Sequence, residues 1–106
     1  MTLLGSIISG RQPAPRRVML YGTHGIGKST FASMAPKPIF IQTEDGLGEI
    51  DCDKFPLSET YPQVIKALAA LYDEAHDYET LVIDSLDWLE RLIWADVCLH
   101  KHVESI

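Results

Sequence analysis

Gly22-Thr23-His24-Gly25-Ile26-Gly27-Lys28-Ser29 is the stretch that decides how this chain folds, because it fits the pattern G-x-x-x-x-G-K-[ST] at every fixed position. We call it the glycine loop. Residues 17–21 before it (RVMLY), apolar after the arginine, predict a short buried strand, and residues 29–35 predict the first turns of a helix that ends at Pro36. A strand, a glycine-rich turn and a helix in this order form a phosphate cradle. These flanks favour a phosphate site over the alternative, a glycine-rich turn that binds nothing.

Each fixed position of the glycine loop has a chemical role in such a cradle. Glycines let successive N–H groups turn toward one anion, and the helix dipole adds to the attraction. Lys28 would reach the β- and γ-phosphates, and the hydroxyl of Ser29 is a suitable ligand for Mg²⁺. His24 occupies a variable position, where it either donates to a phosphate or faces solvent. The predicted nucleotide-binding residues are Gly22, Thr23, His24, Gly25, Ile26, Gly27, Lys28, Ser29 and Thr30.

Bulk composition predicts one small globular domain in the cytoplasm. The chain has 106 residues, 46% of them apolar and 23% charged. A net charge of -6 argues against a broad nucleic-acid surface within these residues. Cys52 and Cys98 lie far apart and show no metal-binding spacing, so we expect reduced thiols. No apolar run is long enough to span a membrane, and residues 1–10 lack the basic start of a signal peptide.

Strands and helices alternate along the rest of the chain. Residues 1–15 contain two prolines and no sustained period, which predicts an arm or linker ahead of a domain at 16–106. Residues 39–43 and 81–83 predict buried strands, and residues 61–75 and 86–102 predict helices. Residues 52–57 predict either a loop or a short edge strand. Alternating elements of this kind predict an α/β fold with a mostly parallel sheet.

Two carboxylates directly follow predicted strands, so they are expected to lie at the same edge of the sheet as the glycine loop. Ligands bind at the carboxyl ends of parallel strands. Asp84, at the end of an apolar run, would hold Mg²⁺ together with Ser29. The alternative is that Asp84 only caps the following helix, although Ser85 can also do so. Glu44 is the candidate general base, unless it is simply a solvated acid in an acidic loop.

With these residues in place, the chain resembles the RecA-like branch of P-loop ATPases, and most closely the phage-type AAA family ATPases of DNA recombination and single-strand annealing. The resemblance runs from about Arg16 to the last residue and includes the acid of residues 41–46 (IQTEDG) and the dipeptide Asp84-Ser85. It implies a three-layer P-loop NTPase fold, with Glu44 and Lys28 as catalytic residues and ATP and Mg²⁺ as cofactors. The guanine-reading pattern N-K-x-D is absent from the sequence.

The main departure from this family is length. Relatives continue beyond residues 103–106, and their strand that carries the sensor group lies between the glycine-loop strand and the Asp84 strand. We therefore expect either the N-terminal part of a longer ATPase or the product of a truncated reading frame, which ends before the later strands and leaves unpaired backbone groups beside the site. Sensor and arginine-finger residues would lie beyond Ile106. The alternative is that a partner or a rearranged pairing fills the gap.

Two functions follow from this interpretation. The first is Mg²⁺-dependent ATP binding and hydrolysis in a phage-like DNA recombination or annealing system, with hydrolysis expected of the complete domain. The second is a nucleotide-binding scaffold or switch without turnover. A phosphotransferase is disfavoured because it would need an arginine-rich lid, and only Arg91 follows the first helix. The resemblance implies single-stranded DNA, contacted through regions or partners outside these residues, and a homo-oligomer as further partners, with no membrane contact.

Overall fold

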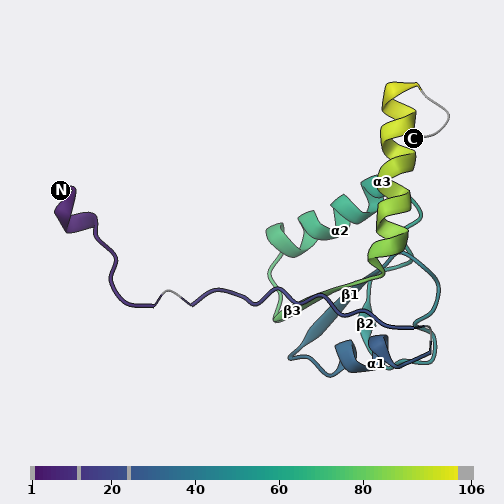
Figure 1. The fold of residues 1–106 in the computed structure, drawn as a ribbon, viewed down its shortest axis with the longest axis horizontal. Coiled ribbons are helices and arrows are strands. Elements are labelled where there is room, and N and C mark those ends of the chain that lie inside the picture. The colour runs from purple at the N-terminus through teal and green to yellow at the C-terminus, as the bar shows by residue number, and fades with distance from the viewer. Residues whose placement is uncertain (1, 12, 24, 103–106) are drawn as a thin grey trace.

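The chain folds around a three-stranded parallel sheet. The computed structural model describes residues 2–11, 13–23 and 25–102. Its strands are β1 (Pro38–Gln42), β2 (Asp53–Lys54) and β3 (Thr80–Asp84), in the order β2-β1-β3 (Figure 1). Strand β1 is central because it is the most apolar of the three, and its four residues from Ile39 to Gln42 are buried. The α/β fold and the parallel sheet are confirmed, as is an edge position for the short strand within 52–57.

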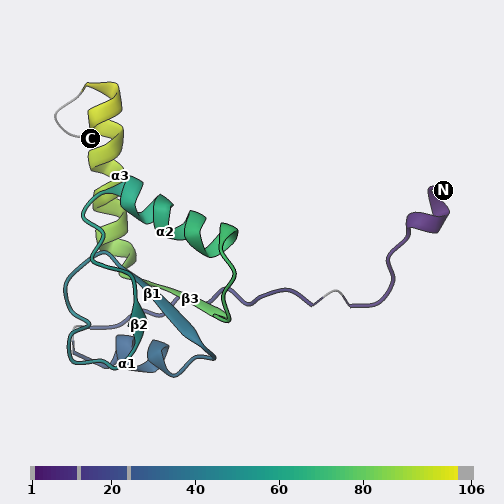
Figure 2. The same ribbon diagram turned by 180° about the vertical axis from the view of Figure 1, so that it is seen from behind.

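Helices cover both faces of this sheet. Helix α1 (Lys28–Ser33) lies on one side, and α2 (Tyr61–Asp73) and α3 (Leu86–Lys101) lie on the other (Figures 1 and 2). Thr60 caps α2 by accepting a hydrogen bond from Gln63 N, and Ser85 caps α3 by accepting one from Trp88 N. Ser85, and not Asp84, is therefore the cap of α3. A short 3-10 turn, η1 (Leu4–Ser6), is the remaining element.

The main core lies between the sheet and the second helix. Ile41 of β1 and Val64 and Ala67 of α2 are buried together, with partly buried residues of β2's flank, α2 and α3 packed around them, namely Phe55, Leu68, Leu89 and Leu92. Phe40 is also fully buried, and because side chains alternate along a strand it lies on the opposite face of β1. Strand β1 is thus held from both sides, which fixes the position of the residues that follow it.

Truncating Val64 is expected to lower the free energy of unfolding. Val64 is 1% exposed, so Val64→Ala leaves a cavity in the core cluster and should cost about 2 kcal/mol. Urea denaturation followed by circular dichroism measures this loss. The matched control is Ile65→Ala on the solvent side of the same helix, where the side chain is 43% exposed and the loss should be much smaller. Equal losses in the two variants would contradict this location of the core.

The predicted strand at residues 17–21 is wrong. This segment has no regular secondary structure, and its apolar side chains Val18, Met19 and Tyr21 are more than 70% exposed. The reason is that a short strand is stable only when a neighbour pairs with its backbone groups. Among the described residues β3 pairs with β1 alone, so its outer edge is open. The segment 17–21 does not close that edge, and the rearranged pairing considered above does not occur there.

The N-terminal part of the chain extends away from the sheet (Figures 1 and 2). Residues 7–11 and 13–22 contain no helix or strand, and the N-terminal end lies far from the three strands in both views (Figures 1 and 2). Cys52 and Cys98 are both free thiols. Within the described ranges, no helix has the length and apolar character required to cross a membrane.

Candidate functional site

The glycine loop and the end of β3 meet through one hydrogen bond. The hydroxyl of Ser29, in the first turn of α1, donates to the Oδ2 atom of the Asp84 carboxylate. These residues are 55 positions apart in the sequence, and both side chains are half-buried. Ser29 is placed by the start of α1, and Asp84 is placed by its register opposite Gln42 of β1. The fold therefore brings together the two residues that the sequence predicts as Mg²⁺ ligands.

Lys28 folds back over the glycine loop. Its Nζ donates to the carbonyl oxygen of Gly22 at 2.7 Å and to that of Thr23 at 3.0 Å. Gly25 and Gly27 have φ angles of +81° and +97°, which residues with a Cβ rarely adopt, so the curvature of the loop depends on glycine there. The ammonium group is thus held by two carbonyl oxygens at the start of the glycine loop. His24 lies outside the described residues.

Glu44 lies at the same edge of the sheet but remains free of these contacts. It is half-buried and lies two residues beyond the end of β1. Among the described residues it forms no hydrogen bond or ion pair with Lys28, Ser29 or Asp84. Its neighbour Asp45 is exposed, so the two adjacent carboxylates have different surroundings. Because no partner for the Glu44 carboxylate is found in ranges 2–11, 13–23 and 25–102, it is available there to a ligand or to water.

Thr43 is a site residue that the sequence analysis missed. It is 4% exposed and lies between the end of β1 and Glu44. Its hydroxyl donates to the carbonyl oxygen of Ser85 at 2.8 Å and accepts from the Ser85 N–H at 2.9 Å. Its own N–H donates to the carbonyl oxygen of Asp84 at 2.9 Å. The only signal in the sequence was a hydroxyl residue directly before the candidate acid.

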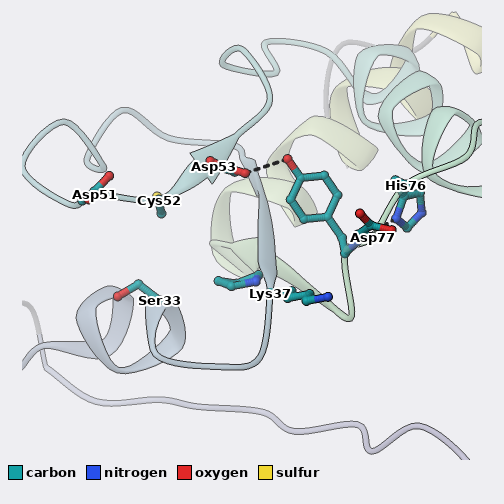
Figure 3. Close-up of a pocket in the computed structure, with 9 residues that line it drawn as sticks. Ser33, Lys37, Asp51, Cys52, Asp53, His76 and Asp77 are labelled. Carbon is teal, nitrogen blue, oxygen red and sulfur yellow. Dashed lines mark hydrogen bonds between the residues drawn. The ribbon is translucent and has the colours of Figure 1, made fainter.

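A wide surface depression lies at the opposite edge of the sheet and contains none of the predicted site residues. It measures about 600 Å³ and is lined at the amino ends of the strands by Lys37, Asp53, His76 and their neighbours (Figure 3). The hydroxyl of Tyr78 donates to the Oδ2 atom of Asp53 at 2.7 Å, and this hydrogen bond raises the pKa of Tyr78. Because parallel sheets bind ligands at their carboxyl edge, we do not assign the nucleotide to this depression.

Comparison with known proteins decides the family. A family model described as an AAA domain matches residues 14–106. The chain belongs to this AAA domain family. It is also 27% identical over 93 residues to the SPbeta prophage-derived uncharacterized protein YorG of Bacillus subtilis (strain 168), covering 84% of this chain and 29% of that protein. The chain thus spans less than a third of the length of this relative. No solved structure matches this chain significantly.

Membership of the AAA domain family indicates that the chain binds a nucleotide. The side chains of Ser29 and Asp84 also suit Mg²⁺, because a serine hydroxyl and a carboxylate supply the hard oxygen ligands that this ion prefers. No group of three or more His, Cys, Asp or Glu residues suitable for a metal occurs in the described part of the chain.

Helix α3 carries further polar and aromatic side chains along its length, from Trp88 in its first turn to His100 in its last turn. His100 Nδ1 is 2.8 Å from the carbonyl oxygen of Asp96 and 3.5 Å from its carboxylate, so the ring contacts the preceding turn of its own helix. Arg91 stacks on Trp88, with its guanidinium carbon 4.5 Å from the ring centroid. Trp94 is 49% exposed and Cys98 is half-buried. These residues are surface features of α3.

Proposed function

We propose that this AAA domain binds ATP with Mg²⁺ and hydrolyses it when the catalytic domain is complete. The observation that carries the proposal is the hydrogen bond between Ser29 and Asp84. It joins a glycine loop, which offers N–H groups and Lys28 to phosphates, to a carboxylate at the end of a parallel strand. An anion site and a cation site are thus adjacent, which is the arrangement that a Mg²⁺–triphosphate requires.

Each residue of the site has a distinct task in this proposal. Lys28 leaves the carbonyl oxygens of Gly22 and Thr23 and donates to the phosphates, where it offsets negative charge. Ser29 and Asp84 would hold Mg²⁺, which supplies further charge neutralisation when it is bound. Glu44 accepts a proton from water at the γ-phosphate. Hydrolysis at such a site depends mainly on positioning and charge stabilisation.

Phage DNA recombination or annealing is the biological setting that we propose. The resemblance carried by residues 41–46 and by Asp84-Ser85 supports it, and so does the prophage origin of a relative. DNA contacts would come from other regions or partners, since the net charge here is -6. Stimulation of ATP turnover by single-stranded DNA in the full-length protein tests this setting. An identical rate with and without DNA would remove the support for it.

Removing the Ser29 hydroxyl is expected to remove the benefit of Mg²⁺. Isothermal calorimetry with ATP should show tighter binding in Mg²⁺ than in EDTA, and Ser29→Ala should lose roughly tenfold of that gain because one ligand is lost. The matched control is Ser33→Ala on the same helix, whose hydroxyl donates to the carbonyl oxygen of Thr30 at 2.6 Å. This control should keep the full gain. A folded wild-type chain that binds no ATP in either condition would overturn the proposed function.

A further inference from the structure

Thr43 joins the two strand ends that carry the candidate carboxylates. Its side-chain oxygen forms two hydrogen bonds with the backbone of Ser85, one to the carbonyl oxygen and one from the N–H. Its backbone N–H forms a third hydrogen bond, to the carbonyl oxygen of Asp84. All three lie between 2.8 and 2.9 Å and involve a side chain that is 4% exposed. Water therefore competes poorly for these contacts.

The two side-chain bonds depend on a hydroxyl group. A hydroxyl both donates and accepts, so a single oxygen satisfies both the carbonyl and the N–H of Ser85. Valine has nearly the same shape as threonine but neither function, and serine retains both. Thr43 can therefore be tested by substitutions that separate hydrogen bonding from packing.

The neighbours of this contact are the residues of the proposed site. Asp84 immediately precedes Ser85, its carboxylate receives the hydroxyl of Ser29, and Glu44 immediately follows Thr43. Ser85 also caps α3, so the backbone here is held both by the helix and by Thr43. A shift of the Ser85 backbone would move the Asp84 carboxylate relative to Ser29.

We propose that Thr43 is a positioning residue that holds the Asp84 carboxylate at Ser29 and thereby sets the Mg²⁺ dependence of nucleotide binding. This proposal rests on the proposed function of the site. Thr43 touches neither nucleotide nor metal in this role, because its one hydroxyl hydrogen is donated to the carbonyl oxygen of Ser85 and the residue is only 4% exposed. Its effect should therefore appear in the Mg²⁺-dependent part of the affinity and not in the part supplied by the glycine loop.

The experiment compares ATP affinity in Mg²⁺ and in EDTA for three variants. Thr43→Val should lose roughly tenfold of the Mg²⁺ gain, as is typical when a group supporting a metal ligand is removed, and should keep its affinity in EDTA. Thr43→Ser should keep the gain. Thr80→Val, at the other end of β3, is the matched control and should behave as wild type, because the hydroxyl of Thr80 has no hydrogen bond among the described residues.

Each outcome decides between the roles of Thr43. An unchanged Mg²⁺ gain in Thr43→Val, or an equal loss of affinity in Mg²⁺ and EDTA, overturns the positioning role while leaving ATP binding intact. If Thr43→Val does not fold, Thr43→Ser alone decides: a lost gain in that variant overturns the proposal, and a retained gain supports it. A wild-type chain without any ATP binding overturns the proposed function and this inference together.

Discussion

Lys28→Ala is expected to abolish ATP binding. The ammonium group of Lys28 contacts the start of the glycine loop, where its Nζ is 2.7 Å from the carbonyl oxygen of Gly22 and 3.0 Å from that of Thr23. A triphosphate in the loop would lose its main positive partner, and truncating one member of a hydrogen-bonded charge pair costs about 2–5 kcal/mol. We therefore expect a loss of affinity of roughly thirtyfold to several thousandfold, measured by calorimetry in Mg²⁺.

The control for this prediction is a second lysine at the opposite edge of the sheet. Lys37 directly precedes β1 and is exposed, so Lys37→Ala removes the same charge without approaching the glycine loop. It should leave the ATP affinity within about twofold of wild type, because exposed charges at this distance are screened. A thermal melt of both variants checks that each is folded. Wild-type affinity in Lys28→Ala would exclude the glycine loop as the nucleotide site.

Local sequence patterns predicted most elements of the fold because those elements depend on local or nearest-neighbour physics. Helix α2 follows from its apolar spacing and its cap at Thr60, and β1 follows from a run of apolar residues that only a buried strand can accommodate. Pro56 predicted an edge position for any strand in 52–57, and β2 does lie at the edge, although it ends at Lys54 before the proline. The parallel sheet follows from the alternation of these elements.

Features that depend on distant pairing were harder to predict. Residues 17–21 have the composition of a strand, yet a strand also requires a neighbour, and composition does not say whether one exists. The role of Thr43 depends on the register that sets Gln42 opposite Asp84, which brings the hydroxyl to a residue 42 positions away. The meeting of Ser29 and Asp84 was predictable, because both follow from the rule that parallel strands present ligands at their carboxyl ends.

Glu44→Gln is expected to leave ATP bound and stop its turnover. The amide has nearly the same shape as the carboxylate, so the loop after β1 should keep its conformation, but the amide cannot accept a proton from water. General-base catalysis typically contributes a factor of about 10²–10⁴, so we expect turnover to fall by at least roughly a hundredfold with the ATP affinity nearly unchanged. Phosphate release from the full-length protein, together with calorimetry, measures both quantities.

Asp45→Asn provides the matched control for Glu44→Gln. Asp45 is the next residue, and it carries the same charge but is exposed, whereas Glu44 is half-buried at the edge that holds Asp84. If acidity of the loop alone mattered, the two variants would lose similar activity. If Glu44 is the general base, only Glu44→Gln should lose turnover, and Asp45→Asn should keep it. Unchanged turnover in Glu44→Gln would exclude Glu44 as the general base. A wild-type protein that binds ATP without turnover would instead favour the nucleotide-binding switch, in which Lys28, Ser29 and Asp84 serve binding alone.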